Sequence, residues 1–168
     1  MNEEHVEVQV EIPRGSRNKY EWDPGEKILR LDRVLHSSVH YPVDYGFIRH
    51  TMAEDGDPLD ALVLVEEGSV PGCVQRVRPV GLLDMIDEHG QDYKILAIPL
   101  DDPRRNTLVK LSEVPSHMLR EIETFFNTYK VLEEKPVEVR GWHDEVEAWR
   151  VIRECQRRHQ EGQVQPTI

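Results

Sequence analysis

Alternating apolar and polar residues near the start of the chain predict its first structural element. Residues 6–12 carry valine or isoleucine at every second position, with glutamate or glutamine between them. This period of two is typical of a strand with one apolar face. Further along, Asp23-Pro24-Gly25-Glu26 separates strand-like segments at 19–22 and 27–35. A Pro-Gly centre suits a type II turn, so these two segments are predicted to form a hairpin.

The middle of the chain continues in short strand-like segments. Residues 45–48 and 59–65 lie on either side of an acidic stretch. Residues 76–87 and 92–98 flank Glu88-His89-Gly90-Gln91, whose composition is typical of a turn. These last two segments are therefore predicted to pair as another hairpin, and the first two-thirds of the chain is predicted to be mostly β.

Helical periodicity replaces this pattern after Pro115. Apolar residues there recur at helical spacing and predict an amphipathic helix that ends near Lys130: Met118, Leu119, Ile122, Phe125, Phe126 and Tyr129. Asp144 and Glu147 resemble a capping box at the start of a second helix, before a polar tail at about 162–168. Short strands followed by helices predict one domain over residues 1–168 with an α+β, mainly β fold, in which helices pack outside a closed or partly closed barrel.

Composition and charge restrict the partners of this domain. The chain has 168 residues, 38% of them hydrophobic, which suggests a small core or burial shared with other subunits. A formal net charge of -11 disfavours nucleic acid and anionic membranes as partners. Cys73 and Cys155 lack the spacing of a zinc site, and no segment resembles a signal peptide or a membrane span. The simplest interpretation is a soluble cytoplasmic protein.

The stretch Asp55-Gly56-Asp57-Pro58-Leu59-Asp60 places three carboxylates within six residues. Like charges held close together raise one another's pKa, and a site that keeps them ionised normally supplies a metal ion or basic groups. Other acids fall near predicted strand ends or turns: Glu11, Glu21, Asp84, Asp87 and Asp92. Carboxylates without cysteine partners suit hard cations. Mg²⁺ is therefore the favoured cofactor.

Basic and phenolic residues in the same kinds of segment could bind phosphate oxygens: Lys19, Arg33, Tyr45, Lys94, Tyr129 and Lys130. Arg33 shares a predicted strand face with Leu29, Leu31 and Leu35. A guanidinium among apolar neighbours must be paired or must bind an anion. The acids and bases together predict a site for a metal ion and a phosphate.

Each of these residues also has a purely structural interpretation. Asp55, Asp57 and Asp60 could be solvated acids of an Asp-Gly turn, and Asp87 with Asp92 could belong to a hydrophilic hairpin tip. Glu11 could simply face solvent from its strand. Arg33 could form a structural ion pair, and Tyr129 could complete the apolar stripe of its helix. An EF-hand is excluded because Asp60 occupies the position at which a calcium loop needs glycine.

Several short sequences resemble the family I soluble inorganic pyrophosphatases in order and spacing, over about residues 6 to 155. The acidic stretch, continued by Ala61, resembles the signature of that family. The other matches are Glu11-Ile12-Pro13, Asn18-Lys19-Tyr20-Glu21, Leu31-Asp32-Arg33, Tyr41-Pro42, Asp44-Tyr45-Gly46-Phe47-Ile48, Arg78-Pro79-Val80-Gly81, Asp87-Glu88, Asp92-Tyr93-Lys94, and Phe125-Phe126 through Tyr129-Lys130. So many ordered matches favour the functional interpretation over the structural ones.

The resemblance implies an OB-like, five-stranded closed barrel with two main helices packed outside, and Mg²⁺-dependent hydrolysis of inorganic pyrophosphate to two phosphates. It also implies a role for each matching residue. Asp55, Asp60 and Asp92 would hold the tighter magnesium ion, and Asp60 would bridge to the second. Asp87 with Asp92 would bind magnesium that arrives with the substrate, and Glu11 and Glu21 would act largely through water. Asp57 would be the general base, while Lys19, Arg33, Tyr45, Lys94, Tyr129 and Lys130 would bind the two phosphoryl groups.

The resemblance further implies a homo-oligomer, often a hexamer in bacteria. Two positions depart from the family pattern, because Asp44 stands where many members carry asparagine and Asp84 where a basic residue is common. Both are expected to add negative charge near the site. Two alternatives to the enzyme stay open: a non-catalytic β-barrel module stabilised by metal, and a broader nucleotide phosphohydrolase. The second lacks support from a Gly-rich phosphate loop or an aromatic pair beside the acids.

Overall fold

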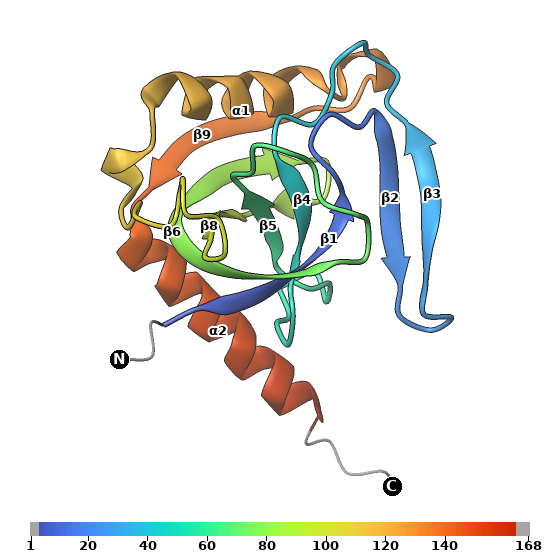
Figure 1. Ribbon diagram of the computed structural model, residues 1–168. Coiled ribbons are helices and arrows are strands. Elements are labelled where there is room, and N and C mark those ends of the chain that lie inside the picture. Colours follow the sequence, from blue (N-terminus) through green and yellow to red (C-terminus); the bar gives the residue numbers. More distant parts are fainter. Residues whose placement is uncertain (1–3, 164–168) are drawn as a thin grey trace, which may run out of the picture.

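The computed structural model describes residues 4–163 (Figure 1). The strands are β1 (Val6–Ile12), β2 (Asn18–Asp23), β3 (Ile28–Val34), β4 (Asp44–Ile48), β5 (Asp60–Val63), β6 (Val74–Asp87), β7 (Gly90–Gln91), β8 (Lys94–Pro99) and β9 (Glu138–His143). The helices are α1 (Ser116–Thr128) and α2 (Glu145–Gln163), with short 3₁₀ helices η1 (Leu111–Glu113) and η2 (Val131–Glu133). The mainly β, α+β fold predicted from the sequence is confirmed.

Five strands form a continuous circuit of hydrogen-bonded pairs. β1 pairs with β4, β4 with β5, β5 with β8, β8 with β6, and β6 again with β1. Only the β5–β8 pair is parallel among the described strands. Gly46 allows β4 to approach β1 closely, because a Cβ atom at this position would lie 2.0 Å from the carbonyl oxygen of Gln9. β7 and β9 extend this sheet by pairing with β6.

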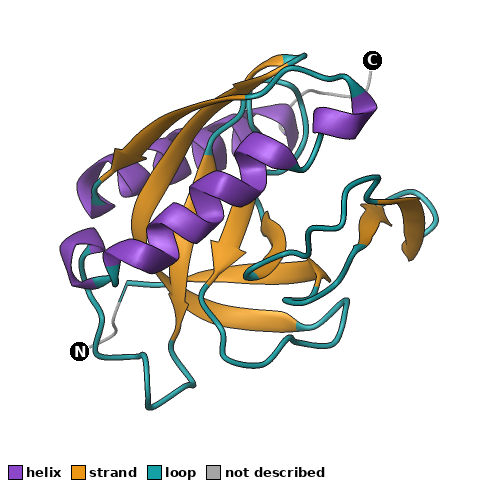
Figure 2. Cartoon of the chain, turned by 90° about the horizontal axis from the view of Figure 1, so that it is seen from above, coloured by secondary structure: helices purple, strands orange, loops and turns teal. Residues whose placement is uncertain are grey.

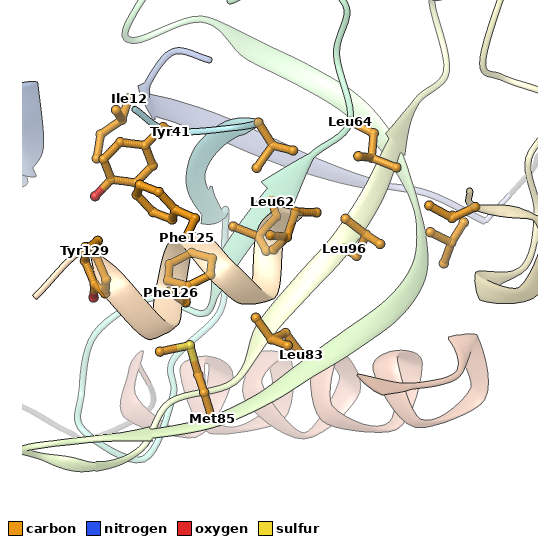
Figure 3. Close-up of a cluster of buried hydrophobic side chains, with 14 of the residues drawn as sticks. Ile12, Tyr41, Leu62, Leu64, Leu83, Met85, Leu96, Phe125, Phe126 and Tyr129 are labelled. Atoms are coloured by element: carbon orange, nitrogen blue, oxygen red, sulfur yellow. The ribbon is translucent and has the colours of Figure 1, made fainter. Parts of the chain in front are cut away.

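Both faces of the central strands are buried. The apolar run around β5 alternates between two clusters, with Leu62 and Leu64 in one and Ala61 and Val63 in the other. The first cluster packs against α1, and Figure 3 shows its aromatic side chains beside the leucines of the strands. The second packs against α2. A continuous apolar run is what a strand buried on both sides requires, which explains why 59–65 lacks alternation.

The two long helices lie where their periodicity predicts, and in Figure 1 they cover different sides of the strands. α1 ends at Thr128, two residues before the predicted end. At the start of α2, the N–H of Glu147 donates to Oδ1 of Asp144, as expected for an N-cap. The helix runs to Gln163, so the predicted polar tail begins later than expected and otherwise lies outside the described residues. Within residues 4–163, no helix combines the length and apolar character needed to cross a membrane.

The β2–β3 hairpin forms a separate two-stranded sheet at the edge of the molecule, set apart from the helices in Figure 2. Its predicted type II turn is wrong. Oδ1 of Asp23 accepts hydrogen bonds from the N–H groups of Gly25 and Glu26, and the positive φ falls on Lys27, at 56°, instead of on Gly25. The expected apolar face around Arg33 is buried only in part, because Leu35 is 4% exposed but Leu31 is 55% exposed.

Candidate active site

A buried ionic cluster forms where β5 and β8 lie side by side. Asp60 and Lys94 are direct partners in this parallel pair. The Nζ of Lys94 donates to Oδ2 of Asp60 at 2.9 Å, to Oδ1 of Asp92 at 3.1 Å and to the hydroxyl of Tyr45 at 3.0 Å. The Tyr45 hydroxyl in turn donates to Oδ2 of Asp60 at 2.7 Å. Four predicted site residues therefore meet at one place.

Electrostatics fix the protonation states in this cluster. Burial alone would lower the pKa of Lys94, but Asp60 and Asp92 together outweigh burial and raise that pKa well above its ordinary value. Burial raises the pKa of Tyr45 well above its ordinary value, so its hydroxyl keeps its proton as a hydrogen-bond donor. Burial also raises the pKa of Asp92, against the opposing effect of Lys94. At neutral pH the cluster therefore holds a charged lysine.

A second group lies on the β2–β3 hairpin. Lys19 forms an ion pair with Glu21, and its Nζ lies 3.6 Å from Oδ2 of Asp32. The Nη1 of Arg33 donates to the same oxygen of Asp32 at 2.6 Å. The Nε of Arg33 lies 2.8 Å from Oε1 of Glu133, which belongs to η2. The two hairpin cations that are predicted to bind phosphate, Lys19 and Arg33, are therefore already paired with acids of this chain.

A third group joins the end of α1 to the turn after β6. The Nζ of Lys130 lies 3.2 Å from Oε2 of Glu88 and 3.6 Å from Oδ2 of Asp87. It also lies 5.4 Å from the ring centroid of Tyr129. Burial alone would lower the pKa of Lys130, but Tyr129 and Glu88 outweigh it and raise this pKa. Burial raises the pKa of Tyr129, whose side chain also lines the first core cluster (Figure 3).

Glu11 connects the hairpin to the buried cluster. Its Oε2 accepts a hydrogen bond from the N–H of Trp22 at 2.7 Å. Burial raises the pKa of Glu11 to about 7, against the opposing effects of the Trp22 hydrogen bond and Lys19, and the charges of Asp60 and Glu21 add to the rise. Glu11 is therefore not the solvent-facing strand residue of the structural interpretation, because its carboxyl group senses both groups of site residues.

Asp57 is the second link between the groups. Burial raises its pKa, and the neighbouring charges of Asp55, Asp60 and Glu21 raise it further. The Asp57 N–H donates to Oδ1 of Asp55 at 2.9 Å within a turn in which Gly56 has a φ of 90°. A positive φ of this kind is readily adopted by glycine. The turn thus holds Asp57 where negative charge makes its carboxylate a stronger base.

A cavity of about 120 Å³ lies beside this turn. Four of the predicted acids contribute to its lining: Asp55, Asp57, Asp60 and Asp92. Val151 and Cys155 of α2 line it from the other side.

Cys155 is a buried free thiol and Cys73 an exposed one, in agreement with the absence of a disulfide framework in the sequence.

The fold brings the predicted acids and bases into one neighbourhood, and it adds three acids to which no role was assigned. Asp32, Glu88 and Glu133 pair with Arg33 or Lys130. Asp32 and Glu88 stand next to predicted site residues in the chain, so adjacency was a signal that could have found them. Glu133 has no such signal, because it lies 100 residues from Arg33 in the sequence.

The donor chemistry of the acids fits a divalent cation, although their geometry differs from that of a coordination sphere. Among residues 4–163, no three His, Cys, Asp or Glu side chains converge as metal ligands. One reason is that the Lys94 ammonium group lies between Asp60 and Asp92. The acids nevertheless offer only carboxylate oxygens, which hard cations prefer. Burial is the largest cause of the raised pKa values of Glu11, Asp57 and Asp92, and neighbouring acids add to it at each of these residues.

Asp44 and Asp84, the two residues that depart from the family pattern, each form hydrogen bonds with a different set of residues. Asp44 is fully buried, and its carboxylate accepts hydrogen bonds from the N–H groups of Arg14 and Ser69 and from Nε2 of Gln75. These donors hold its carboxylate in a structural network, and the effect of its charge on the site stays a prediction. Asp84 accepts a hydrogen bond from Nε2 of Gln91 at 2.8 Å and lies 3.2 Å from Nε2 of His143.

Comparison with known proteins gives one consistent result. A family model described as inorganic pyrophosphatase matches residues 8–160. An inorganic pyrophosphatase of Methanosarcina mazei is 53% identical over 162 residues, or 96% of each chain, and one of Synechocystis sp. is 47% identical over 150 residues, or 89% of each. The crystal structure of inorganic pyrophosphatase from Thermus thermophilus has a TM-score of 0.91 at 46% identity, covering 95% of this chain and 93% of that chain. This chain belongs to the inorganic pyrophosphatase family.

Proposed function

We propose that this chain hydrolyses inorganic pyrophosphate to two phosphates and that Mg²⁺ is its cofactor. The observation that carries the proposal is the position of Asp57. Its carboxyl group has a raised pKa beside Asp55 and Asp60, and Asp60 contacts the buried ammonium group of Lys94. The proposal takes Asp57 as the base, the neighbouring acids as the cation site and Lys94 as a phosphate-binding group, and its support is that these residues lie close together. Family membership supports the substrate.

The acids and bases have distinct roles in this proposal. Asp55, Asp60, Asp87 and Asp92 would hold Mg²⁺, with Glu11 and Glu21 acting through water. When bound, Mg²⁺ would offset the charge of pyrophosphate and make water a better proton donor. Lys19, Arg33, Tyr45, Lys94, Tyr129 and Lys130 would bind and orient the two phosphoryl groups, because charged and hydroxyl donors stabilise charge on phosphate oxygens.

Asp57 would accept the proton of the attacking water. A general base works best when its pKa lies near the operating pH, and the raised pKa of Asp57 moves it in that direction. Lys94, kept protonated by Asp60 and Asp92, would then stabilise charge on the departing phosphate. Repulsion between the attacking oxygen and the charged substrate is the main barrier that these groups must offset.

The barrel geometry is part of the same proposal. We infer that the circuit β1–β4–β5–β8–β6 is the OB-like five-stranded closed barrel implied by the resemblance. Its support is that the ladder of hydrogen-bonded pairs returns from β6 to β1, where Val6 pairs with Val77 and Gln9 with Val74. Such a barrel would place the site residues of β4, β5 and β8 on neighbouring strands.

Phosphate release tests the substrate and the cofactor together. Pyrophosphate should be hydrolysed with Mg²⁺ and not with excess EDTA, and ATP should react far more slowly under the same conditions. Equal rates for pyrophosphate and ATP would support the nucleotide phosphohydrolase. If the protein hydrolyses neither substrate but is still stabilised by the metal, the result would support the non-catalytic module.

Asp57→Asn tests the proposed base. We expect kcat to fall by about 10²- to 10⁴-fold, the usual contribution of a general base, with thermal stability and metal binding retained. Asp101→Asn is the matched control, because Asp101 is a 70% exposed acid whose partner is Arg76. Turnover by Asp57→Asn equal to that of the control would exclude Asp57 as the base.

Assembly and location are the remaining parts of the proposal. We propose a homo-oligomer, with a hexamer as the specific expectation, that acts in the cytoplasm. Light scattering coupled to size-exclusion chromatography measures the assembly directly, and a monomer at micromolar concentration would contradict it. Cell fractionation measures the location.

A further inference from the structure

Arg33 has two acid partners that differ in how deeply they are buried. Its Nη1 donates to Oδ2 of Asp32 at 2.6 Å, and its Nε lies 2.8 Å from Oε1 of Glu133. The Asp32 side chain is 34% exposed, whereas that of Glu133 is 5% exposed. Water and a dissolved anion can therefore reach the Asp32 contact more easily than the Glu133 contact.

Glu133 depends on Arg33 for compensation of its charge. Its second oxygen, Oε2, is buried and has no hydrogen-bond partner among residues 4–163. Removing the cation from such a carboxylate is costly, because a buried charge without a partner loses its hydration and gains nothing in return. The Arg33–Glu133 pair should therefore persist when a ligand arrives, while the more exposed Asp32 contact can be exchanged.

The position of Glu133 gives this pair a geometric role. Glu133 belongs to η2, which directly follows Lys130, whereas Arg33 belongs to the separate β2–β3 sheet. The pair joins the hairpin to the part of the molecule that carries Lys130 (Figure 1). The contact at Nε is an ion pair and not a hydrogen bond, because Nε is itself buried without a hydrogen-bond partner among residues 4–163. The Nη1 side is paired with the more exposed Asp32.

We propose that Glu133 is a positioning residue for substrate binding: it holds Arg33 while a phosphoryl group of the substrate replaces Asp32 at Nη1. This inference rests on the proposed function, since it takes Arg33 as a phosphate-binding residue. Asp32 then stands in the free protein where phosphate oxygens stand in the complex. The two acids act in opposite directions on affinity, because one orients the guanidinium and the other competes for it.

The sign of the change in KM separates this role from a simple effect of charge. Removing either acid takes negative charge away from a site for a polyanion, which by itself would tighten binding in both variants. The positioning role predicts opposite signs. We expect Glu133→Gln to raise the KM for pyrophosphate about tenfold while kcat changes by less than about threefold, as for loss of one oriented charge-assisted contact. We expect Asp32→Asn to lower KM.

Two further variants complete the experiment. Glu134→Gln is the matched control, because this neighbouring glutamate is exposed, and its KM should equal that of the wild type. In an Arg33→Ala background, Glu133→Gln should cause no further rise in KM, because residues that act through one another are not additive. A fall in KM for both single variants, or an equal rise with and without Arg33, would overturn the inference. If Glu133→Gln does not fold, Glu133→Asp keeps the charge and shortens the side chain, so a rise in KM would then report the lost contact with Arg33 alone, and an unchanged KM would overturn the inference.

Direct binding keeps this test separate from the test of hydrolysis. If the wild type does not hydrolyse pyrophosphate, the proposed function fails, and calorimetric titration with inorganic phosphate in Mg²⁺ then measures the contrast between Glu133→Gln and Asp32→Asn as a ratio of Kd values. The same opposite signs are expected. Absence of phosphate binding to the wild type would overturn the inference as well, because no anion would then replace Asp32.

Discussion

Lys94 and Lys19 perform the same pairing in two different environments. Each lies near two carboxylates, Asp60 and Asp92 for Lys94, and Glu21 and Asp32 for Lys19. The Lys94 side chain is 2% exposed within the sheet, whereas that of Lys19 is 17% exposed on the hairpin. Breaking a buried ion pair leaves an uncompensated charge, while an exposed pair contributes little to stability. Lys94 should therefore contribute to both stability and function, whereas Lys19 should contribute mainly to function.

Lys94→Met should produce the largest effect. It leaves Asp60 and Asp92 close together without their cation, and we expect a loss of about 3–5 kcal/mol in the free energy of unfolding without metal. Urea denaturation in EDTA measures this loss. Mg²⁺ should recover part of it, because a ligand that binds only the folded state stabilises that state. A loss below about 1 kcal/mol would show that the buried pair is no stronger than a surface pair.

The pH dependence of stability should come next in size, through Glu11, whose charge interacts with both lysine environments. Its pKa is about 7 in the folded protein against an ordinary 4.5, so between these values the folded state holds a proton that the unfolded state has lost. This contribution is complete below about pH 4.5 and is lost as pH rises through 7. It amounts to roughly 3 kcal/mol.

Denaturation in EDTA at several pH values measures the effect. Glu11→Gln should remove part of the decline in stability between pH 4.5 and 7, leaving the contributions of Asp57 and Asp92, whose pKa values are also raised. Identical slopes for the variant and the wild type would exclude Glu11 as a source of the decline.

Lys19→Met should have the smallest effect on stability and so provides the counterpart of Lys94→Met. We expect a change below about 1 kcal/mol in the free energy of unfolding, as for a largely surface ion pair. The KM for pyrophosphate should nevertheless rise, because a charge that is proposed to bind phosphate is lost. Equal destabilisation by the two lysine substitutions would remove the distinction between the two environments.

The sequence predicts elements well where periodicity is regular, as in residues 6–12, and fails where it is broken. β9 was missed because its apolar residues, Val139 and Trp142, are three positions apart. The register shifts opposite Asp84 and Met85, at the point where Gly141 has a φ of 129°. This irregularity brings both apolar residues against the same core cluster, which a pattern of period two cannot indicate.

The sequence predicts which acids and bases belong to the candidate site, but it does not predict which of them pair with one another. Asp55, Asp57 and Asp60 attract attention because they crowd into one short stretch, and the resemblance to a family supplied a role for each candidate residue. Pairing depends on contacts between distant segments. Glu133 meets Arg33 only because η2 lies beside the hairpin, and its local sequence carries no trace of that contact.

The parallel pairing of β5 with β8 also has a consequence for how the protein folds. Asp60 and Lys94 lie opposite each other although the chain between them forms β6 and β7. Contacts between residues distant in sequence require closure of a long loop and are formed slowly. The ionic cluster should therefore appear together with the completed sheet, so that recovery of activity during refolding reports the same step as formation of the core.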